Sequence, residues 1–502
     1  MGGIWSGFLA ALQWDMMLFT LIGVVAGVTI GALPGLTSTM GVALLIPLTF
    51  GMRPEVGLAM LGGIYCASTY GGAITAILIN IPGTPSACAT VLDGYPLARK
   101  GEATRAISVA TIVSCLGGLF STVCLLFLAP PLAQLSLRFG APEYFLLAVF
   151  GITIIASLSE EGLEKGLISG VLGLLLSVVG MHPLTGYLRF TFGQSFLFDG
   201  VPLVVALIGL FSIPEVLELV SSESSQSVEV VGTYTGRPLQ HLKEALTLKW
   251  LILRSSIIGV IIGIIPGAGT DIAAFLAYNE ARRASKTPDE FGKGAIEGVA
   301  AAECANNAVT GGSLIPLLTL GVPGNAVSAI FLGGLLIHGL RPGAALFAEN
   351  ATITYGFIFS LFLSNILFVP VGFIMARYAT RILRTPRSVL APAIVVLAVI
   401  GSLAIRGLAV DVFLMLGMGL LGCIMKYNGM PAAPMVLGLV LGTMAEGELA
   451  RALAIVRGDV LAFLLQLVTR PICIVVLALC VLSIWQGISN QAKRKRSVGQ
   501  EA

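Results

Sequence analysis

The sequence is poor in charge: Asp, Glu, Lys and Arg make up 11% of its 502 residues, against roughly 25% in soluble proteins. Hydrophobic residues make up 56%. A transmembrane helix needs about 20 predominantly apolar residues. The composition therefore excludes a soluble fold, and it predicts an all-α polytopic membrane protein with about 11–13 transmembrane helices, some of them broken or re-entrant. Uncharged runs occur at 16–52, 56–92, 106–137, 255–270, 304–340, 350–376 and 471–492.

Other absences narrow the function. The net charge of +3 implies no nucleic-acid partner. The eight cysteines form no CxxC pair, and His182, His241 and His338 are far apart, so no metal-ligand spacing is present. There is no HExxH, Walker or GxSxG motif, which argues against common enzyme chemistries. The N-terminal stretch lacks a basic region, so we expect no cleaved signal peptide.

Within the apolar run 16–52, one short segment has the residues that stop and restart a helix. Pro34 lacks an amide hydrogen and breaks a helix, and Gly35 allows a turn. Thr37 and Ser38 are good helix N-caps. We predict a helix that enters the membrane, stops at depth and begins again.

The run 56–92 has a second break of the same kind. Pro82 and Gly83 interrupt it, Thr84 is a suitable N-cap, and Pro85 suits the first helical position. A second helix that stops and restarts is therefore expected here.

Both breaks recur in the same order in the second half of the chain. Pro34–Gly35 is matched by Pro266–Gly267, and Pro82–Gly83 by Pro323–Gly324, at a nearly constant offset. We interpret this as a duplicated unit. The domains expected are a first membrane repeat at 1–220, a polar linker at 221–249, a second membrane repeat at 250–490 and a basic tail at 491–502.

Basic residues indicate the orientation of the two repeats. After the first break, the first half has few basic residues and the second half has several. After the second break the first half has more basic residues than the second half. Under the positive-inside rule, equivalent loops then lie on opposite sides of the membrane, which predicts an inverted repeat. After the first break, the residues compared are Arg53 in the first half and Arg282, Arg283, Lys286 and Lys293 in the second half. After the second break, they are Arg99, Lys100 and Arg105 in the first half and Arg341 in the second half.

Four breaks at depth predict a polar cavity, because unpaired backbone groups survive in a membrane only inside protein or beside water. A helix that restarts there directs free N–H groups and its positive dipole end into the cavity, which suits a carboxylate. No Lys or Arg lies in the runs around the breaks. The substrate-binding residues predicted are Thr37, Ser38, Asn80, Pro82, Gly83, Thr84, Ser86, Pro323, Gly324 and Asn325.

The segment ECANNAVTGG, which begins at Glu303, is the most polar one within an apolar context. On a helix, Glu303, Asn307 and Thr310 share a face, with Asn306 beside them. An acid inside a membrane suggests a functional role by default, here carrying a proton or helping to bind sodium. The alternative is a solvated Glu303 at the interface. The cation-coupling residues predicted are Glu303, Asn306, Asn307, Thr310, Gly267, Thr270 and Asp271, with Na⁺ near Asn306, Asn307 and Thr310.

These features predict a cation-coupled carboxylate carrier and no enzyme. Two alternatives stay open: an intramembrane enzyme acting on a lipid-linked substrate through Glu303 and Asp271, and a channel. Duplicated breaks argue against the enzyme, and saturation with counter-exchange would distinguish a carrier from a channel.

Four long motifs resemble one known family. They are GALPGLTSTMGVALLIPLTF, YGGAITAILINIPGTPSACATVLDGYPLARKGEA, IPGAGTDIAAFLAYNEARRASK and FGKGAIEGVAAAECANNAVTGGSLIPLLTLGVPGNAVSAIFLGGLLIHGLRPG. Together they resemble the large membrane subunit of the tripartite tricarboxylate transporter family over about residues 14–480. The chain departs from the family pattern at Tyr65-Cys66-Ala67-Ser68, where many relatives have a second aromatic residue and a small residue. We expect this departure to affect packing.

The resemblance implies a multi-pass protein of the bacterial inner membrane that acts with two partners, a small four-helix membrane subunit and a periplasmic substrate-binding protein. It also implies uptake of carboxylates such as citrate by an ion gradient, and an elevator-like alternating-access step. No cofactor beyond the coupling ion is expected.

Overall fold

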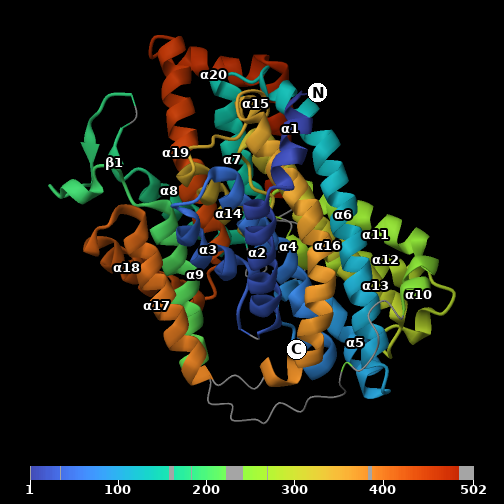
Figure 1. The fold of residues 1–502 in the computed structure, drawn as a ribbon. Coiled ribbons are helices and arrows are strands. Elements are labelled where there is room, and N and C mark those ends of the chain that lie inside the picture. The colour runs from blue at the N-terminus through green and yellow to red at the C-terminus, as the bar shows by residue number, and fades with distance from the viewer. Residues whose placement is uncertain are drawn as a thin grey trace, which may run out of the picture. The chain divides into compact units, whose positions relative to one another are not determined.

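A computed structural model describes residues 2–33, 35–157, 163–182, 184–221, 234, 241–267, 269–382 and 387–485 of the chain. Apart from a two-stranded hairpin, the regular structure of this part is helical (Figure 1). Contacts divide the chain into two compact units: unit 1 is Met1–Leu132 with Glu215–Ile405, and unit 2 is Ala133–Pro214 with Arg406–Ala502. Each unit therefore draws on both halves of the sequence.

Unit 1 contains the four breaks. Two long helices, α6 (Ala103–Ser136) and α9 (Leu203–Ser221), lie partly in unit 1 and partly in unit 2. Its other elements are α1 (Gly2–Ala11), α2 (Trp14–Ala32), α3 (Ser38–Leu45), η1 (Ile46–Thr49), α4 (Pro54–Ile79), η2 (Pro85–Ala87), α5 (Cys88–Arg99), α10 (Leu242–Thr247), α11 (Lys249–Ile264), α12 (Gly269–Ala284), η4 (Pro288–Glu290), α13 (Ile296–Leu320), α14 (Ala326–Ile337), α15 (Ala344–Ala348), α16 (Ala351–Ile382) and α17 (Arg387–Arg406).

Unit 2 is a smaller group of helices that carries the hairpin. Its elements are α7 (Ala141–Ser157), α8 (Leu163–Ser177), β1 (Gly180–Met181), β2 (Leu188–Arg189), η3 (Ser195–Leu197), α18 (Ala409–Tyr427), α19 (Ala432–Ile455) and α20 (Val460–Thr469). The two strands pair antiparallel, with Gly180 opposite Arg189.

The polytopic membrane architecture is confirmed, with fewer full-length spans than expected. Among the described residues, 8 helices are long and apolar enough to cross a membrane, or up to 9 if the pair Val460–Thr469 and Pro471–Trp485, bent by 85°, is one span. The estimate of 11–13 is higher because several apolar stretches form short helices. Three such pieces are Ser38–Thr49, Ala141–Thr153 and Ala326–Ile337, two of which follow a predicted break.

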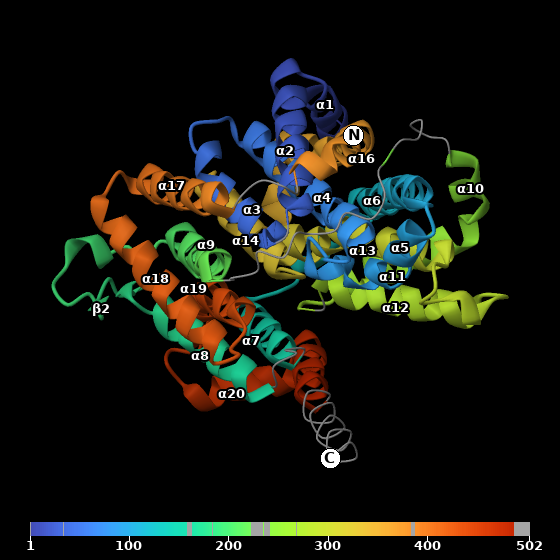
Figure 2. The ribbon, with the colours of Figure 1, turned by 90° about the horizontal axis from the view of Figure 1, so that it is seen from below.

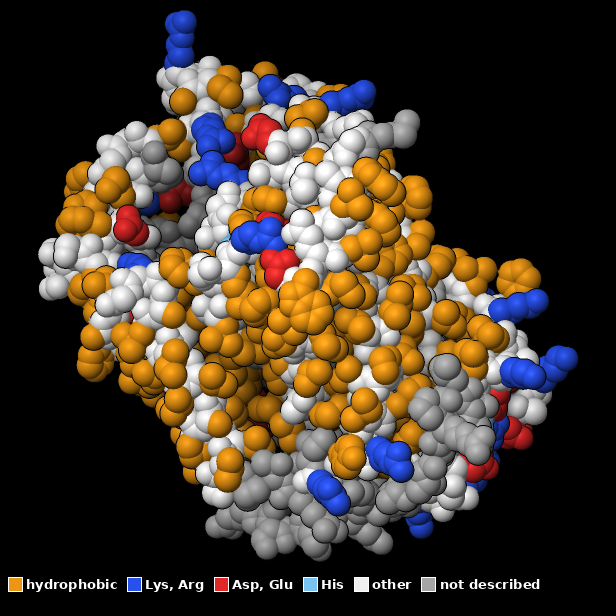
Figure 3. All heavy atoms as spheres, in the orientation of Figure 1, with side chains coloured by type: hydrophobic (Ala, Val, Ile, Leu, Met, Phe, Trp, Pro, Cys, Tyr) orange, Lys and Arg blue, Asp and Glu red, His pale blue; other side chains and the backbone are white. Residues whose placement is uncertain are grey.

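Hydrophobic side chains cover the middle of α2, α6 and α16 on the face of unit 1 shown in Figure 3. Lys and Arg lie towards the helix ends. This is the distribution that a lipid environment favours.

Small residues allow neighbouring helices to approach closely. Gly23, Gly27 and Gly31 lie against α4, where a Cβ at Gly27 would be 2.7 Å from the Ile64 carbonyl oxygen. Gly438 and Gly442 of α19 lie in the same way against α8. Both glycine series are helix-packing seams, as their spacing predicts.

The centre of unit 1 is formed by α4 and α13. Almost every residue of both helices is buried. They contact each other, while α2 packs along α4 and α11 packs along α13 (Figures 1 and 2). This arrangement places the polar segment that begins at Glu303 in the interior of the unit.

The predicted linker at 221–249 lies mostly outside the described residues. Within it the structure describes Ser221, the buried Tyr234 and the segment 241–249, which includes α10. The predicted basic tail at 491–502 also lies outside them.

Candidate functional site

Helices end and restart at all four predicted positions. The breaks before α3, after α4 and after α13 each separate a longer helix from a shorter one, whereas the break before α12 lies between two helices of 16 residues. The four junctions are Ala32 to Ser38, Ile79 to Pro85, Ile264 to Gly269 and Leu320 to Ala326.

The breaks before α3 and α12 depend on glycine and a cap. Gly35 has φ +89° and Gly267 has φ +81°, values that favour glycine. Thr37 is the N-cap of α3, and its side chain accepts a hydrogen bond from the Met40 N–H at 3.2 Å. Ser38 is the first residue of α3 and is buried. Pro34 lies outside the described residues.

The breaks after α4 and α13 share a backbone geometry. Asn80 ends α4 with φ 59°, and Gly321 ends α13 with φ 72°, so both helices stop in the left-handed conformation. A Cβ at Gly83 would overlap the carbonyl oxygen of Gly31, and a Cβ at Gly324 would overlap that of Gly263. We call the segments 80–86 and 321–328 tip 1 and tip 2.

Tip 1 is partly open. Asn80 is exposed and Pro82 is half-buried, whereas Gly83, Thr84 and Ser86 are buried. The hydroxyl groups of Thr84 and Ser86 lie 3.0 Å apart. Thr84 makes no side-chain cap to η2, which leaves its hydroxyl group for a neighbour or a ligand.

Tip 2 is closed and hydrogen-bonded to α4. Pro323, Gly324 and Asn325 are all buried. Asn325 Oδ1 accepts from the Ser328 N–H at 2.8 Å, and Ser328 Oγ accepts from the Asn325 N–H at 2.9 Å, a capping box. Asn325 Nδ2 donates to the Tyr65 hydroxyl at 2.7 Å, and that hydroxyl lies 2.9 Å from Ser313 Oγ.

The second half also joins its two breaks directly. The Gly267 N–H donates to the Gly324 carbonyl at 2.7 Å. Thr270 and Asp271 lie in the first turn of α12 and are half-buried. Helix α12 contacts η2, which begins in tip 1, and α3 contacts α14, which begins in tip 2. The helix after the first break of each half therefore packs beside the tip of the other half.

Glu303 is fully buried, which excludes the solvated interfacial position considered above. Thr90 of α5 donates to its Oε1, and Ser114 of α6 donates to its Oε2 at 3.2 Å. Within the described residues no Lys, Arg or His forms an ion pair with Glu303. A carboxyl group in this environment is held by hydroxyl groups alone.

Asn306, Asn307 and Thr310 are buried beside α4. Asn306 Nδ2 donates to the Thr69 carbonyl at 3.2 Å, and Thr310 Oγ1 donates to the Asn307 carbonyl at 2.7 Å. Among the described residues, Asn306 Oδ1 and both amide atoms of Asn307 have no hydrogen-bond partner. Because buried polar groups are nearly always paired, these atoms are suited to a ligand or an ion.

Asn365 on α16 was not predicted from the sequence. It is fully buried, and its Nδ2 donates to the Leu361 carbonyl at 2.8 Å and lies 3.9 Å from the Cys66 sulfur. The same sulfur lies 3.9 Å from Thr310 Oγ1, and Asn365 Oδ1 has no partner among the described residues. A lone amide within the uncharged run 350–376 was the available signal.

Asp93 was also missed. It is fully buried on α5 and accepts hydrogen bonds from the Gly294 and Ala295 N–H groups at 2.7 and 2.8 Å and from the Tyr278 hydroxyl at 2.9 Å. Its carboxylate thus ties the helix that follows tip 1 to the start of α13, where the helix dipole favours a negative charge.

A comparison with known protein families identifies the chain. Residues 17–437 match the family described as "Tripartite tricarboxylate transporter TctA family". The chain belongs to the TctA family. It is therefore the large membrane subunit of a transporter and not an enzyme, and family membership implies TctB and TctC partners in a tripartite system.

Two relatives of this TctA-family chain are known from Agrobacterium vitis. An "Uncharacterized 52.8 kDa protein in TAR-I ttuC' 3'region" is 39% identical over 486 residues, which cover 97% of this chain and 96% of the relative. An "Uncharacterized protein in TAR-II ttuC' 3'region" is 37% identical over 238 residues, which cover 47% of this chain and 97% of the relative. No solved structure is a significant match.

Proposed function

We propose that this TctA-family chain is the translocating subunit of a binding-protein-dependent secondary transporter that takes up carboxylates, a tricarboxylate such as citrate or a related di- or monocarboxylate, by a cation gradient. The observation that carries the proposal is the pair of tips. Each is an interrupted membrane helix whose glycine, Gly83 or Gly324, lies directly on the backbone of the helix before the preceding break. Interrupted membrane helices form the substrate and ion sites of many secondary transporters.

The contacts among the helices around the breaks also support two inverted repeats, 1–220 and 250–490. Helices α2, α3 and α4 correspond in order and contact to α11, α12 and α13. In unit 1, α5, which follows tip 1, and α15, which comes soon after tip 2, lie at opposite ends (Figure 1). An elevator-like movement of the tips between two sides of the membrane is consistent with this arrangement.

A carboxylate would be held by tip backbones and neutral side chains. The binding set is the one named from the sequence, with Thr84, Ser86 and Asn325 at the starts of the second helices. Within the described residues, no Lys or Arg lies in either tip, so helix N-termini and a co-bound cation would balance the negative charge.

The coupling ion would bind along α13. Among the described residues, the amide oxygens of Asn306, Asn307 and Asn365 have no hydrogen-bond partner, and neutral oxygens of this kind are suitable ligands for sodium. Glu303 is the residue that would carry a proton instead. We favour sodium, because Glu303 is the sole acid on the buried polar face of α13.

The partners proposed are a small four-helix membrane subunit and a periplasmic substrate-binding protein, in the bacterial inner membrane. The test is uptake of radiolabelled citrate, tartrate and succinate in proteoliposomes that contain this chain with both partners, under sodium and proton gradients imposed separately. Saturable uptake driven by sodium supports the proposal in full. Uptake driven by protons alone would transfer the coupling role to Glu303, and no uptake under either gradient would contradict a cation-coupled carrier of these substrates.

A second experiment addresses the tips. Single cysteines introduced by Thr84→Cys and Asn325→Cys, in a background without the eight native cysteines, should become protected from a membrane-impermeant thiol reagent when substrate and coupling ion are both present. Unchanged labelling at both positions would remove the tips from the site.

A further inference from the structure

The hairpin of unit 2 lies in the segment between α8 and α9 and exposes several aromatic side chains. In both ribbon views it extends away from α8 and α19 of the same unit (Figures 1 and 2). Its strands are only two residues long each, so the strand pairing contributes little to its position.

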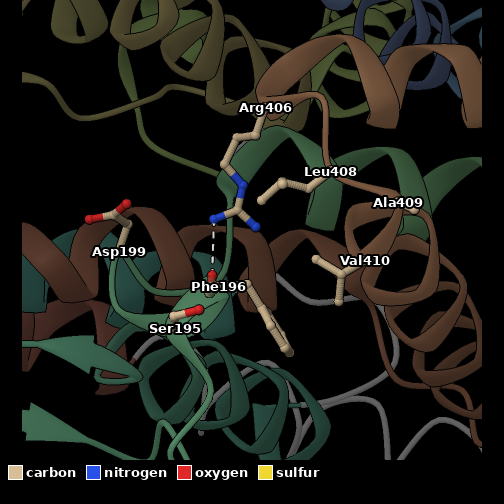
Figure 4. Close-up of a pocket in the computed structure, with 7 residues that line it drawn as sticks. All are labelled: Ser195, Phe196, Asp199, Arg406, Leu408, Ala409 and Val410. Carbon is tan, nitrogen blue, oxygen red and sulfur yellow. Dashed lines mark hydrogen bonds between the residues drawn. The ribbon is translucent and has the colours of Figure 1, made fainter.

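Ion pairs on the inner side hold the hairpin in place. Arg189 of β2 pairs with Glu446 of α19, with Nη2 and Oε2 3.0 Å apart. Beyond β2, Arg406 donates to the Phe196 carbonyl at 3.1 Å (Figure 4). The Arg406 guanidinium also donates to the buried Asp411 carboxylate at 3.0 Å. The open pocket of about 400 Å³ beside Arg406 therefore has its guanidinium already engaged, and we assign it no anion.

The outer side of the hairpin is aromatic. Along β2 and the residues after it, Arg189 and Thr191 face the protein, whereas Phe190 and Phe192 are 61% and 84% exposed. Tyr187 is 72% exposed. Phe190 and Phe192 also have φ +51° and +50°, a conformation that bulky residues rarely adopt, so the fold accepts backbone strain where it presents these rings.

The hairpin has almost no charge with which to face water. Between Leu184 and Phe198 the single charged residue is Arg189, and its charge is neutralised by Glu446. Continuity with α8 indicates what covers the aromatic side. Ile168, Val171 and Leu175 share one exposed apolar face of that helix, and lipid is the partner that such a face would have in a protein that crosses the membrane.

We propose that the hairpin is a membrane-interface anchor: Tyr187, Phe190 and Phe192 insert at the boundary between lipid headgroups and acyl chains beside unit 2. Aromatic side chains favour this layer, and interfacial elements bury their apolar side roughly 5–10 Å into it. The ion pair of Arg189 with Glu446 sets the depth of the hairpin relative to α19. The inference is independent of what the chain transports.

The test uses a Trp reporter in the full-length chain, reconstituted in phosphatidylcholine–phosphatidylglycerol vesicles. The Phe192→Trp variant is compared with the unmodified chain, and the added fluorescence is read as the difference between the two emission spectra. We expect blue-shifted emission, little quenching by aqueous acrylamide, and strong quenching when the phosphatidylcholine carries bromine on the upper part of its acyl chains. Bromine near the methyl end of the chains should quench less.

A matched control is Lys286→Trp, at an exposed position in the charged loop between α12 and α13. Its added Trp should show red-shifted emission that aqueous acrylamide quenches strongly and that brominated lipid does not quench. If Trp at position 192 behaves like Trp at position 286, the interface anchor is wrong and the aromatic side faces water or a protein partner. Arg189→Ala combined with Phe192→Trp should weaken the dependence of quenching on bromine position, because the anchor then lacks its fixed depth; an unchanged dependence would contradict the role given to the ion pair.

Discussion

Tyr65 and Asn325 are 260 residues apart in sequence, yet Asn325 Nδ2 donates a hydrogen bond of 2.7 Å to the Tyr65 hydroxyl. Both residues are buried. Tyr65 lies in the middle of α4 and Asn325 caps the helix that restarts after α13, so this one bond joins the first half of the chain to tip 2. Ser313, 2.9 Å from the same hydroxyl, completes the contact.

Removing the hydroxyl should loosen tip 2. We expect Tyr65→Phe to lower uptake about tenfold, since a buried amide left without a partner costs roughly 1–3 kcal/mol and 1.4 kcal/mol corresponds to a factor of ten. Initial uptake rates in proteoliposomes measure the effect. The control is Tyr144→Phe in unit 2, which also loses a hydroxyl hydrogen bond, to the Ser136 carbonyl; equal losses in both variants would show that the effect is not specific to tip 2.

Two asparagines should be essential for uptake: Asn307 on α13, whose amide atoms have no hydrogen-bond partner among the described residues, and Asn325, the cap of tip 2. Asn307→Ala and Asn325→Ala should each abolish uptake while the amount of protein in the membrane stays near normal, as judged by immunoblot. Asn428→Ala, at an exposed turn after α18, serves as the control and should transport normally. Near-normal uptake by both test variants would exclude this cluster from the site.

The two tip glycines should respond alike. Gly83→Ala and Gly324→Ala each place a Cβ onto a carbonyl oxygen, and such overpacking costs roughly 1–3 kcal/mol. We expect a lower Tm and a loss of uptake in both. Gly51→Ala is the matched control, because no heavy atom lies within 4 Å of its added Cβ. A tip variant with unchanged Tm would show that its helix does not lie where the structure places it.

Glu303 distinguishes sodium from proton coupling. Glu303→Gln preserves the size of the side chain and an oxygen that accepts from Thr90 or Ser114, but it cannot release a proton. Under a sodium gradient at constant pH we expect most of the uptake to remain. A variant that keeps its Tm but takes up no substrate would instead identify Glu303 as the coupling residue.

A pH effect on stability is expected outside the membrane, at α10. Partial burial raises the pKa of Glu244, but hydrogen bonds from Arg105 and His241 outweigh it and hold the pKa below its usual value. Because the folded-state pKa is depressed, the stabilisation is present above the unfolded-state pKa and is lost as pH falls through the folded-state pKa. Glu244→Gln should therefore lower the Tm at neutral pH, by the equivalent of about 1 kcal/mol or less, and leave it unchanged in acid.

The control for this pH effect is Glu290→Gln, at an exposed position in η4. Its Tm should follow that of the unmodified chain at both pH values. A Glu244→Gln difference that persists in acid would mean that packing, rather than charge, links α10 to α6.

Much of the fold and part of the candidate site could be predicted from the sequence. Membrane class follows from composition, because apolar runs without charge have no other stable environment. The breaks follow from local chemistry: Pro82 and Gly83 specify a stop and a turn, and Thr84 takes the N-cap position of η2, although its side chain makes no capping hydrogen bond there. The polar face from Glu303 to Thr310 follows from helical periodicity.

Tertiary structure alone decided which of these groups meet. Nothing near Asn325 in sequence identifies Tyr65 as its partner, and Asn365 becomes part of the candidate site only because α16 brings it beside Cys66. The interior position of Glu303 depends on Thr90 and Ser114, contributed by two other helices. Local sequence determines where a helix stops and which face is polar, whereas the partner of a buried polar group is set by packing among segments hundreds of residues apart.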